Sequence, residues 1–445
     1  MHKGTLSWML LGLFLLAGVD PAAGVEGART ERERARLHNQ IVLKKLDTVL
    51  GPAMRANDIQ LWVVLTREYN VDPAFAFVTP DGTYPGGRNA YVFIDAGPEA
   101  SGRPERIVIG SHQWKQGAPF FDRVIAARGK AVGEELRKLV EQYQPRRIGV
   151  NMAQQTSAAD GLTASMKDYL VEALGPEYAK RLVSAERLVI DYLDTRLPEE
   201  EALFREAAEV TRKIWEEAFS GKVITPGKTT AGDVLWFIRQ RCADHNVGIW
   251  FRPDLRVQRR GMKFDPSEVP PDEFVLERGD VLHLDFGIIY LDFSTDYQKH
   301  AYILREGETD VPAGLQRALE NTNRLQDILL SEMKPGRTGQ ETYFASMERA
   351  KAAELNAMVY SHSIGNYGHF VGAAIGSFTS GSSPGLRGSL PLRLGSYTSI
   401  ELNTRTAVPE WDGQDVFIMM EDDAALTPQG MRFFIPRQTR WYLVR

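Results

Sequence analysis

The chain has 445 residues, which is enough for two domains with substantial hydrophobic cores. Its formal net charge of -5, with 25% charged residues, leaves no basic excess of the kind that binds nucleic acid or an anionic membrane surface. The single cysteine, Cys242, excludes a disulfide framework and a thiolate metal site, so any bound metal must be held by oxygen and imidazole ligands.

The N-terminus has the layout of a secretory signal peptide. A short basic start at Met1-His2-Lys3 precedes an apolar run from Leu6 to Val19, and small residues follow up to Gly24. The apolar run is shorter than the roughly 20 residues that a membrane-spanning helix needs, and an uncleaved anchor is the alternative. We therefore expect residues 1–24 to be a signal peptide and the mature protein to be exported, periplasmic or secreted, with no membrane attachment after cleavage.

Residues 25–196 alternate between strand-like and helix-like segments, which predicts a small mixed α/β domain. This part contains no glycine-rich phosphate loop and no nucleophile elbow, so we expect it to shape a cleft or make a subunit contact. The predicted helices are 28–50, 131–143 and 163–174, and the predicted strands are 59–65, 89–96, 106–109 and 147–151.

Residues 197–445 are predicted to form one catalytic-type domain with a weak internal repeat. The segment from Leu197 to Glu201 is typical of a helix start, because proline and then acidic residues fill the first turn. Two Pro-Gly-basic-Thr turns, 225–229 and 334–338, lie 109 residues apart, which indicates a pseudo-twofold arrangement. Each turn joins two predicted helices: 199–220 and 232–242 in the first copy, and 313–333 and 340–355 in the second.

Two carboxylates, Asp285 and Asp296, lie at opposite ends of a predicted β-hairpin. Acidic side chains that share one partly buried face of a sheet repel each other, so a hard divalent metal ion between them is expected. The alternative is that Asp285 ends a strand and Asp296 lies in a solvated turn. Asp292, inside the hairpin, is interpreted as a turn residue.

Four later segments carry further candidates. His362 and His369 lie in a glycine-rich stretch that does not suit a regular helix. Glu401 lies among strand formers, and Glu421 follows an apolar strand that begins at Val416. His300 lies on the strand that leaves Asp296. Each residue alone has an ordinary structural explanation, but the order Asp, Asp at plus eleven, His, Glu and Glu is more specific.

That order resembles the pita-bread metallopeptidases, which include methionine aminopeptidase, Xaa-Pro aminopeptidase and prolidase, with metal-free creatinase as a relative. The resemblance implies a C-terminal pseudo-twofold pita-bread domain over 197–445, preceded by a creatinase-like N-terminal α/β domain over 25–196. It also implies a homodimer. The metal ligands that it implies are Asp285, Asp296, His362, Glu401 and Glu421.

The resemblance further implies two divalent metal ions, bridged by Asp296 and Glu421. Asp285 would complete one coordination sphere, and His362 and Glu401 the other. We expect manganese first, with cobalt, zinc and iron as alternatives. Two such ions activate a water for attack on a peptide carbonyl, Glu401 would accept its proton, and His369 would hydrogen-bond the substrate.

The residues that surround these ligands depart from the prolyl enzymes of the family. Met358, Met419 and Gln298 stand where a histidine, an arginine and a threonine are usual. The segment 250–270 lacks the usual histidine and contains Arg256, Arg259 and Arg260 instead. His300 and Arg405 are therefore candidate substrate-binding residues of an altered shell, although a structural role is at least as plausible for each.

The expected function is hydrolysis at the N-terminus of a peptide substrate, by an aminopeptidase or dipeptidase for which Xaa-Pro peptides are one candidate substrate. Two alternatives stay open. One is a hydrolase or lyase of the same fold that acts on a small non-peptide substrate, and the other is a binding protein without catalysis.

Overall fold

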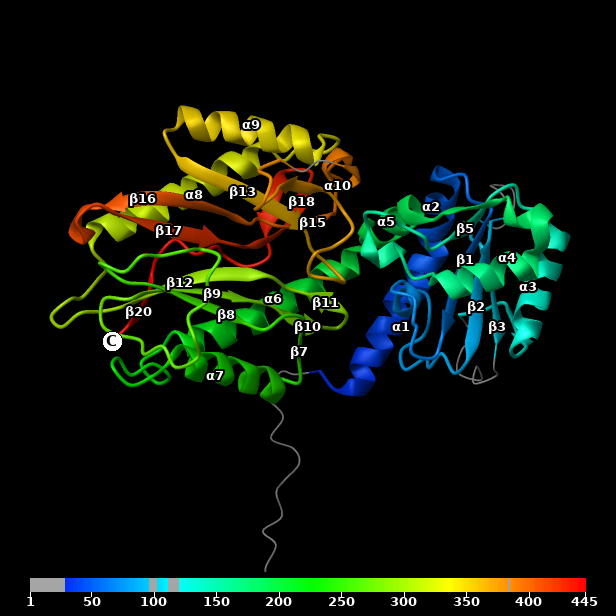
Figure 1. Ribbon diagram of the computed structural model, residues 1–445, viewed down its shortest axis with the longest axis horizontal. Coiled ribbons are helices and arrows are strands. Elements are labelled where there is room, and N and C mark those ends of the chain that lie inside the picture. The colour runs from blue at the N-terminus through cyan, green and yellow to red at the C-terminus, as the bar shows by residue number, and fades with distance from the viewer. Residues whose placement is uncertain (1–28, 96–101, 111–119, 383–384) are drawn as a thin grey trace, which may run out of the picture.

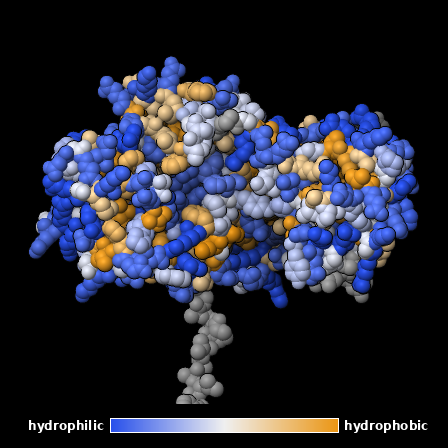
Figure 2. All heavy atoms as spheres, in the orientation of Figure 1, coloured by the Kyte–Doolittle hydropathy of each residue, from blue (hydrophilic) through white to orange (hydrophobic). Residues whose placement is uncertain are grey.

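The computed structural model describes residues 29–95, 102–110, 120–382 and 385–445, and the predicted signal peptide lies outside this part of the chain. The chain forms a smaller N-terminal lobe and a larger C-terminal lobe, side by side (Figure 1). Hydrophilic residues cover most of the face seen in Figure 2, and the hydrophobic ones lie in small groups. None of the helices in the described ranges is long and apolar enough to cross a membrane.

The N-terminal lobe is a six-stranded mixed sheet, β4-β3-β2-β1-β5-β6, with helices on both faces. The central strand β1 (Leu61–Arg67) is buried on both sides because its residues alternate between two cores. Leu61, Val63 and Leu65 pack toward α3 and α4, whereas Trp62 and Val64 pack toward α1, α2 and α5. The other elements are α1 (Glu31–Thr48), α2 (Leu50–Ala56), β2 (Arg88–Ile94), β3 (Glu105–Gly110), β4 (Arg123–Ala126), α3 (Lys130–Tyr143), β5 (Ile148–Val150), α4 (Ala164–Ala179), β6 (Leu182–Ser184) and α5 (Glu186–Asp194).

The helix predicted over 28–50 is confirmed as α1, and a second helix, α2, follows directly after a break at Val49. Pro52 has no N–H to donate to the carbonyl of Thr48, so the first helix cannot continue through this point. The other helices and strands predicted for this lobe are confirmed, with shifted ends.

The C-terminal lobe consists of two similar units, each with two helices outside a sheet (Figure 1). In the first unit, α6 and α7 share a core with β8, β9 and β12, and in the second, α8 packs against β16 and β17. The first unit comprises α6 (Pro198–Ala218), α7 (Ala231–Asp244), β7 (Gly248–Ile249), β8 (Asp254–Gln258), β9 (Val281–Phe286), β10 (Ile288–Tyr290), β11 (Phe293–Ser294) and β12 (Tyr297–Ile303). The second comprises α8 (Ala313–Glu332), α9 (Gly339–Ala352), β13 (Asn356–Ser363), β14 (Ala374–Gly376), α10 (Leu386–Ser389), β15 (Tyr397–Ser399), β16 (Leu402–Val408), β17 (Gln414–Met420), β18 (Asp423–Thr427) and β19 (Gly430–Phe433). The last strand, β20 (Tyr442–Val444), returns to the first unit and pairs with β12.

The two predicted Pro-Gly turns occupy equivalent places in the two units. Gly227 and Gly336 both have positive φ angles, 75° and 85°, which glycine adopts without strain. Thr230 and Thr338 then cap α7 and α9 with capping boxes. The predicted pseudo-twofold repeat is therefore confirmed.

The sheets of the two units face each other in the middle of the lobe. The first has the order β20-β12-β9-β8, and the second has the order β17-β16-β13-β15-β18-β19 with β14 paired to β13. An isolated bridge between Gln298 and Glu421 joins the two sheets. All five predicted metal ligands lie near this junction.

Candidate metal centre

The predicted hairpin brings Asp285 and Asp296 together. β9 and β12 pair antiparallel, with Asp285 opposite Gln298. Between them, the chain forms the small β10–β11 hairpin, whose two-residue turn, Leu291-Asp292, has φ angles of 51° and 62°. Asp292 is thus a turn residue, as expected. Asp285 is the penultimate residue of β9, and Asp296 directly precedes β12.

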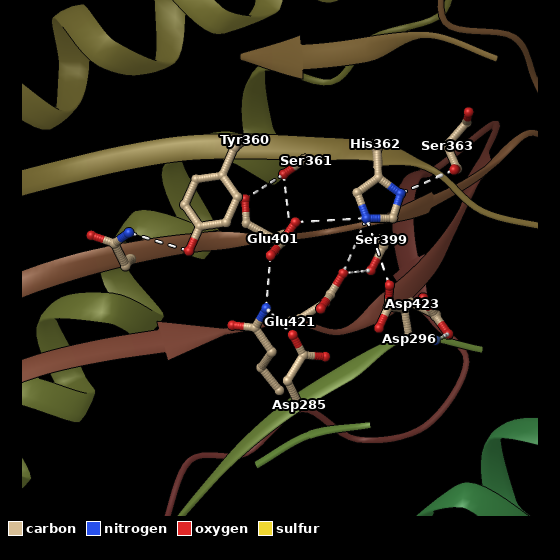
Figure 3. A network of polar contacts seen from close by, with 12 residues as sticks. Asp285, Asp296, Tyr360, Ser361, His362, Ser363, Ser399, Glu401, Glu421 and Asp423 are labelled. Carbon is tan, nitrogen blue, oxygen red and sulfur yellow. Dashed lines mark hydrogen bonds and ion pairs between the residues drawn. The ribbon is translucent and has the colours of Figure 1, made fainter. Parts of the chain in front are cut away.

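The second unit supplies the opposite wall of the site. His362 lies near the end of β13, Glu401 lies in the break between β15 and β16, and Glu421 directly follows β17. In Figure 3, His362 and Glu401 point toward Asp285 and Asp296 from the facing strands. His362, Asp296 and Glu421 are buried, whereas Asp285 and Glu401 are half-buried.

The five side chains form one cluster. The Nε2 atom of His362 lies 3.3 Å from Oε1 of Glu421, 3.6 Å from Oε2 of Glu401 and 3.8 Å from Oδ2 of Asp296. Donor atoms of Asp285, Asp296 and Glu421 lie within 4.8 Å of one another, and so do those of His362, Glu401 and Glu421. The cluster thus contains two overlapping triads that share Glu421.

The unpaired atoms of the cluster fit divalent metal ions. Oδ1 of Asp285, Oδ1 of Asp296 and Nε2 of His362 are buried without a hydrogen-bond partner among the described residues. The Nδ1 atom of His362 lies 3.1 Å from the carbonyl oxygen of Ser363, which accepts a hydrogen bond only if Nδ1 carries the proton. Nε2 then presents a lone pair to the carboxylates, as metal-binding histidines do.

The electrostatics of the protein alone do not favour this cluster of acids. Desolvation first, and then the charge of Glu421, raise the pKa values of Asp285, Asp296 and Glu401 well above their ordinary range. Two divalent cations would offset the four carboxylate charges. The donor set of carboxylate oxygens and one imidazole suits first-row divalent metals.

Neighbouring groups hold the carboxylates in place. Ser399 Oγ donates to Glu421 at 2.6 Å, and the N–H of Asp296 donates to Asp423 at 3.0 Å. The side-chain amide of Gln298 donates to Oε1 of Glu401 at 2.7 Å and lies 3.4 Å from Oδ2 of Asp285. The sequence marked Gln298 as a departure from the family, but did not reveal this bridge between ligands on the two sheets.

A cavity of about 610 Å³ opens over the cluster. His369 is exposed in its wall, with its ring centroid 4.6 Å from that of His362. Desolvation by the surrounding protein lowers the pKa of His369 to about 4, so its ring is neutral at pH 7. Arg256, Arg387 and Met419 also line this cavity.

Two predicted substrate residues do not reach the cavity, so these predictions need correction. His300 is fully buried, and its Nε2 atom lies 2.8 Å from the carbonyl oxygen of Met419, because the strand β12 turns this side chain into the sheet junction. Arg405 lies on the outer part of β16, where it donates to Asn356 at 3.3 Å and covers the ring of Phe417. Both side chains have structural contacts.

The N-terminal lobe supports the segments that carry His369 and Arg387. The hydroxyl of Tyr367 donates to the carbonyl oxygen of Pro73 at 2.7 Å, and Gln155 accepts from the N–H of Leu386 at 2.5 Å. The N-terminal lobe thus contacts the segments that carry two cavity residues, although none of its own described residues lines the cavity. Sequence reasoning missed Gln155 and Arg387, since neither belongs to a recognisable motif.

Comparison with known proteins gives one family and a consistent fold. Residues 202–428 match the family model "Metallopeptidase family M24". The structure is similar to X-Pro aminopeptidase from Thermotoga maritima, with a TM-score of 0.64 and 18% identity over 88% of this chain and 100% of that one. It is also similar to Xaa-Pro dipeptidase from Bacillus anthracis, with a TM-score of 0.60 and 18% identity over 91% and 100%.

The same fold is also found in a subunit of a protein complex. The N-terminal domain of a FACT complex subunit from chickpea (Cicer arietinum) has a TM-score of 0.62 and 12% identity, over 91% of this chain and 99% of that one. Similarity of fold alone therefore does not establish catalysis. A comparison with curated proteins finds no match.

Proposed function

Because this chain belongs to metallopeptidase family M24, we propose that it is a dinuclear-metal peptidase that removes the N-terminal residue of short peptides. The observation that carries this proposal is the cluster of four carboxylates and one imidazole, whose Nε2 atom has no hydrogen-bond partner among the described residues, at the floor of the cavity. All five ligand positions of the family pattern contain a metal-binding residue type, as expected of an enzyme rather than of a protein that has lost catalysis.

Asp285, Asp296 and Glu421 would hold one metal ion, and His362, Glu401 and Glu421 the other, with Asp296 as a second bridge. When bound, the metal pair would lower the pKa of a water molecule and polarise the peptide carbonyl. The assignment of ligands to the two ions agrees with the two overlapping triads, which share Glu421. Manganese is the first candidate for both ions.

Glu401 is the proposed proton acceptor. Gln298 occupies its Oε1 atom, which leaves Oε2 to face the centre of the cluster, 3.6 Å from His362 Nε2. A mutual pair of hydrogen bonds between the Ser361 hydroxyl and the backbone of Glu401 fixes its position. The ring of His369 lines the cavity and makes no hydrogen bond within the described part of the chain. It can therefore donate to the developing oxyanion of the substrate.

Arg387 supports a preference for short peptides with a free C-terminus. Its side chain lines the cavity and donates to Ser363 Oγ and to the carbonyl oxygen of Gly372, both at 3.3 Å. It has no ion pair within the described ranges, and desolvation lowers its pKa. A half-buried guanidinium that lines the cavity and has no ion-pair partner of its own among the described residues is a suitable anchor for the C-terminal carboxylate of a dipeptide.

The test is hydrolysis by the manganese-loaded protein of four matched substrates: Ala-Pro, Ala-Ala and their C-terminal amides. Comparison of Ala-Pro with Ala-Ala tests whether proline is required. We expect the free acids to be cleaved faster than the amides. The Arg387→Gln variant should lose this preference for the free acid. Absence of any cleavage, with two metal ions bound, would instead favour a non-peptide substrate.

From the sequence and the family, we further propose that the protein is exported after cleavage near residue 24, that its two domains meet at residues 196–197, and that it forms a homodimer. Cell fractionation, limited proteolysis and sedimentation of the mature protein would test these in turn.

A further inference from the structure

Arg256 is a second cationic side chain in the wall of the cavity. It lies on β8, the strand beside β9, and its backbone neighbour across the ladder is His283. Two residues earlier on the same strand, Asp254 lies directly opposite Asp285. Arg256 therefore flanks the cluster on the Asp285 side, whereas Arg387 contacts Ser363 and Gly372, beyond His362.

An ion pair holds the guanidinium of Arg256 in place, but not every N–H donor of this group has a hydrogen-bond partner. Its Nη2 atom pairs with Oδ2 of Asp254 at 2.6 Å, and both side chains are 17% exposed. Its Nε atom is buried without a partner among the described residues. An arginine anchored along one edge can still bind a second carboxylate with the rest of its donors.

The charges in the cavity wall favour an anionic substrate. Among the described lining residues, the carboxylates are Asp285 and Glu401, both in the metal cluster, and the permanent cations are Arg256 and Arg387. If two divalent ions offset the cluster, one arginine on each side stays available to the substrate, with Asp254 offsetting part of the charge on the Asp285 side.

Resting on the peptidase function proposed above, we propose that Arg256 is a specificity-determining residue that selects substrates with an acidic residue on the N-terminal side of the scissile bond. Arg387 is placed to take the C-terminal carboxylate, so the rest of a dipeptide extends over the metal pair toward Arg256. A glutamate or aspartate side chain at that end can reach the unused donors of the guanidinium.

The experiment compares Glu-Ala with Gln-Ala and Glu-Pro with Gln-Pro, which differ only in charge at the first side chain. The wild type should show a kcat/KM at least about tenfold higher for each glutamate substrate, as expected for a charged hydrogen bond. Arg256→Gln should remove this preference, and Arg256→Lys should keep part of it. Arg260→Gln is the matched control, because Arg260 is four residues away in an ion pair with Asp412 and does not line the cavity.

Calorimetric binding of glutamate and glutamine to the manganese-loaded protein gives a readout that does not depend on turnover. Glutamate should bind more tightly than glutamine to the wild type, but not to Arg256→Gln. Equal kcat/KM for the paired substrates, an equal loss on both in Arg256→Gln, or equal affinity for the two amino acids would overturn the assignment. If no dipeptide is cleaved, the proposed function fails, and the binding comparison still decides the role of Arg256.

Discussion

Glu421 and Asp422 are neighbours in the chain and both are buried, yet their carboxylates have opposite surroundings. Asp422 accepts hydrogen bonds from Lys299 at 2.6 Å and from Gln326 at 2.9 Å. Glu421 instead faces Asp285 and Asp296, with the hydroxyl of Ser399 as a donor. The protein balances Asp422 with the charge of Lys299, whereas it leaves Glu421 among other acids, which is the pattern expected of the proposed metal site rather than of the core.

Loss of one shared carboxylate of the acid cluster should have the largest effect. Asp296→Ala should lower kcat/KM by about 10³-fold or more, because metal ions supply several kcal/mol of transition-state stabilisation. Metal analysis and peptide hydrolysis would measure it. Asp292→Ala is the matched control: it removes an aspartate from the same hairpin but outside the cluster, and should retain both metal and activity.

Removal of the cation from the balanced pair should affect stability instead. Lys299→Met leaves Asp422 buried without its charge partner and should lower the free energy of unfolding by about 3–5 kcal/mol. Chemical denaturation would measure the change. The double variant Lys299→Met/Asp422→Leu should recover most of the stability. If it does not, the loss in Lys299→Met does not come from the unpaired charge of Asp422.

His369→Gln should separate catalysis from metal binding. If His369 donates to the oxyanion, kcat should fall by about 10²-fold while the two metal ions are retained. A variant that loses metal as well would show that His369 is a ligand, an arrangement that the proximity of Asp296, His362 and His369 also permits.

The pH dependence of stability should differ between the metal-free and the metal-loaded protein. The pKa values of Asp285, Asp296 and Glu401 are raised in the metal-free fold, so the folded state binds more protons than the unfolded state above about pH 4. Stability should therefore fall as pH rises from about 4 toward neutrality, by up to about 1.4 kcal/mol per pH unit for each such group. Thermal unfolding with chelator should show this fall, and added manganese should remove it.

The sequence predicted the cluster because its members belong to a spaced pattern, and it predicted the fold because β1, α3 and the two Pro-Gly turns have clear local signals. It did not predict which side chains surround the cluster. His300 and Gln298 are two residues apart on β12, yet one contacts Met419 in the sheet junction and the other donates to Glu401. The packing of the two sheets decides between these contacts, and no local pattern encodes that packing.

The most direct test of the central claim is the number of divalent ions bound by the purified protein. Calorimetric titration of the chelator-treated chain with manganese, checked by elemental analysis, should give two ions per chain in the wild type and in Asp292→Ala, and fewer than two in Asp296→Ala. A wild-type protein that binds no divalent metal, or binds it equally well without Asp296, would contradict the account.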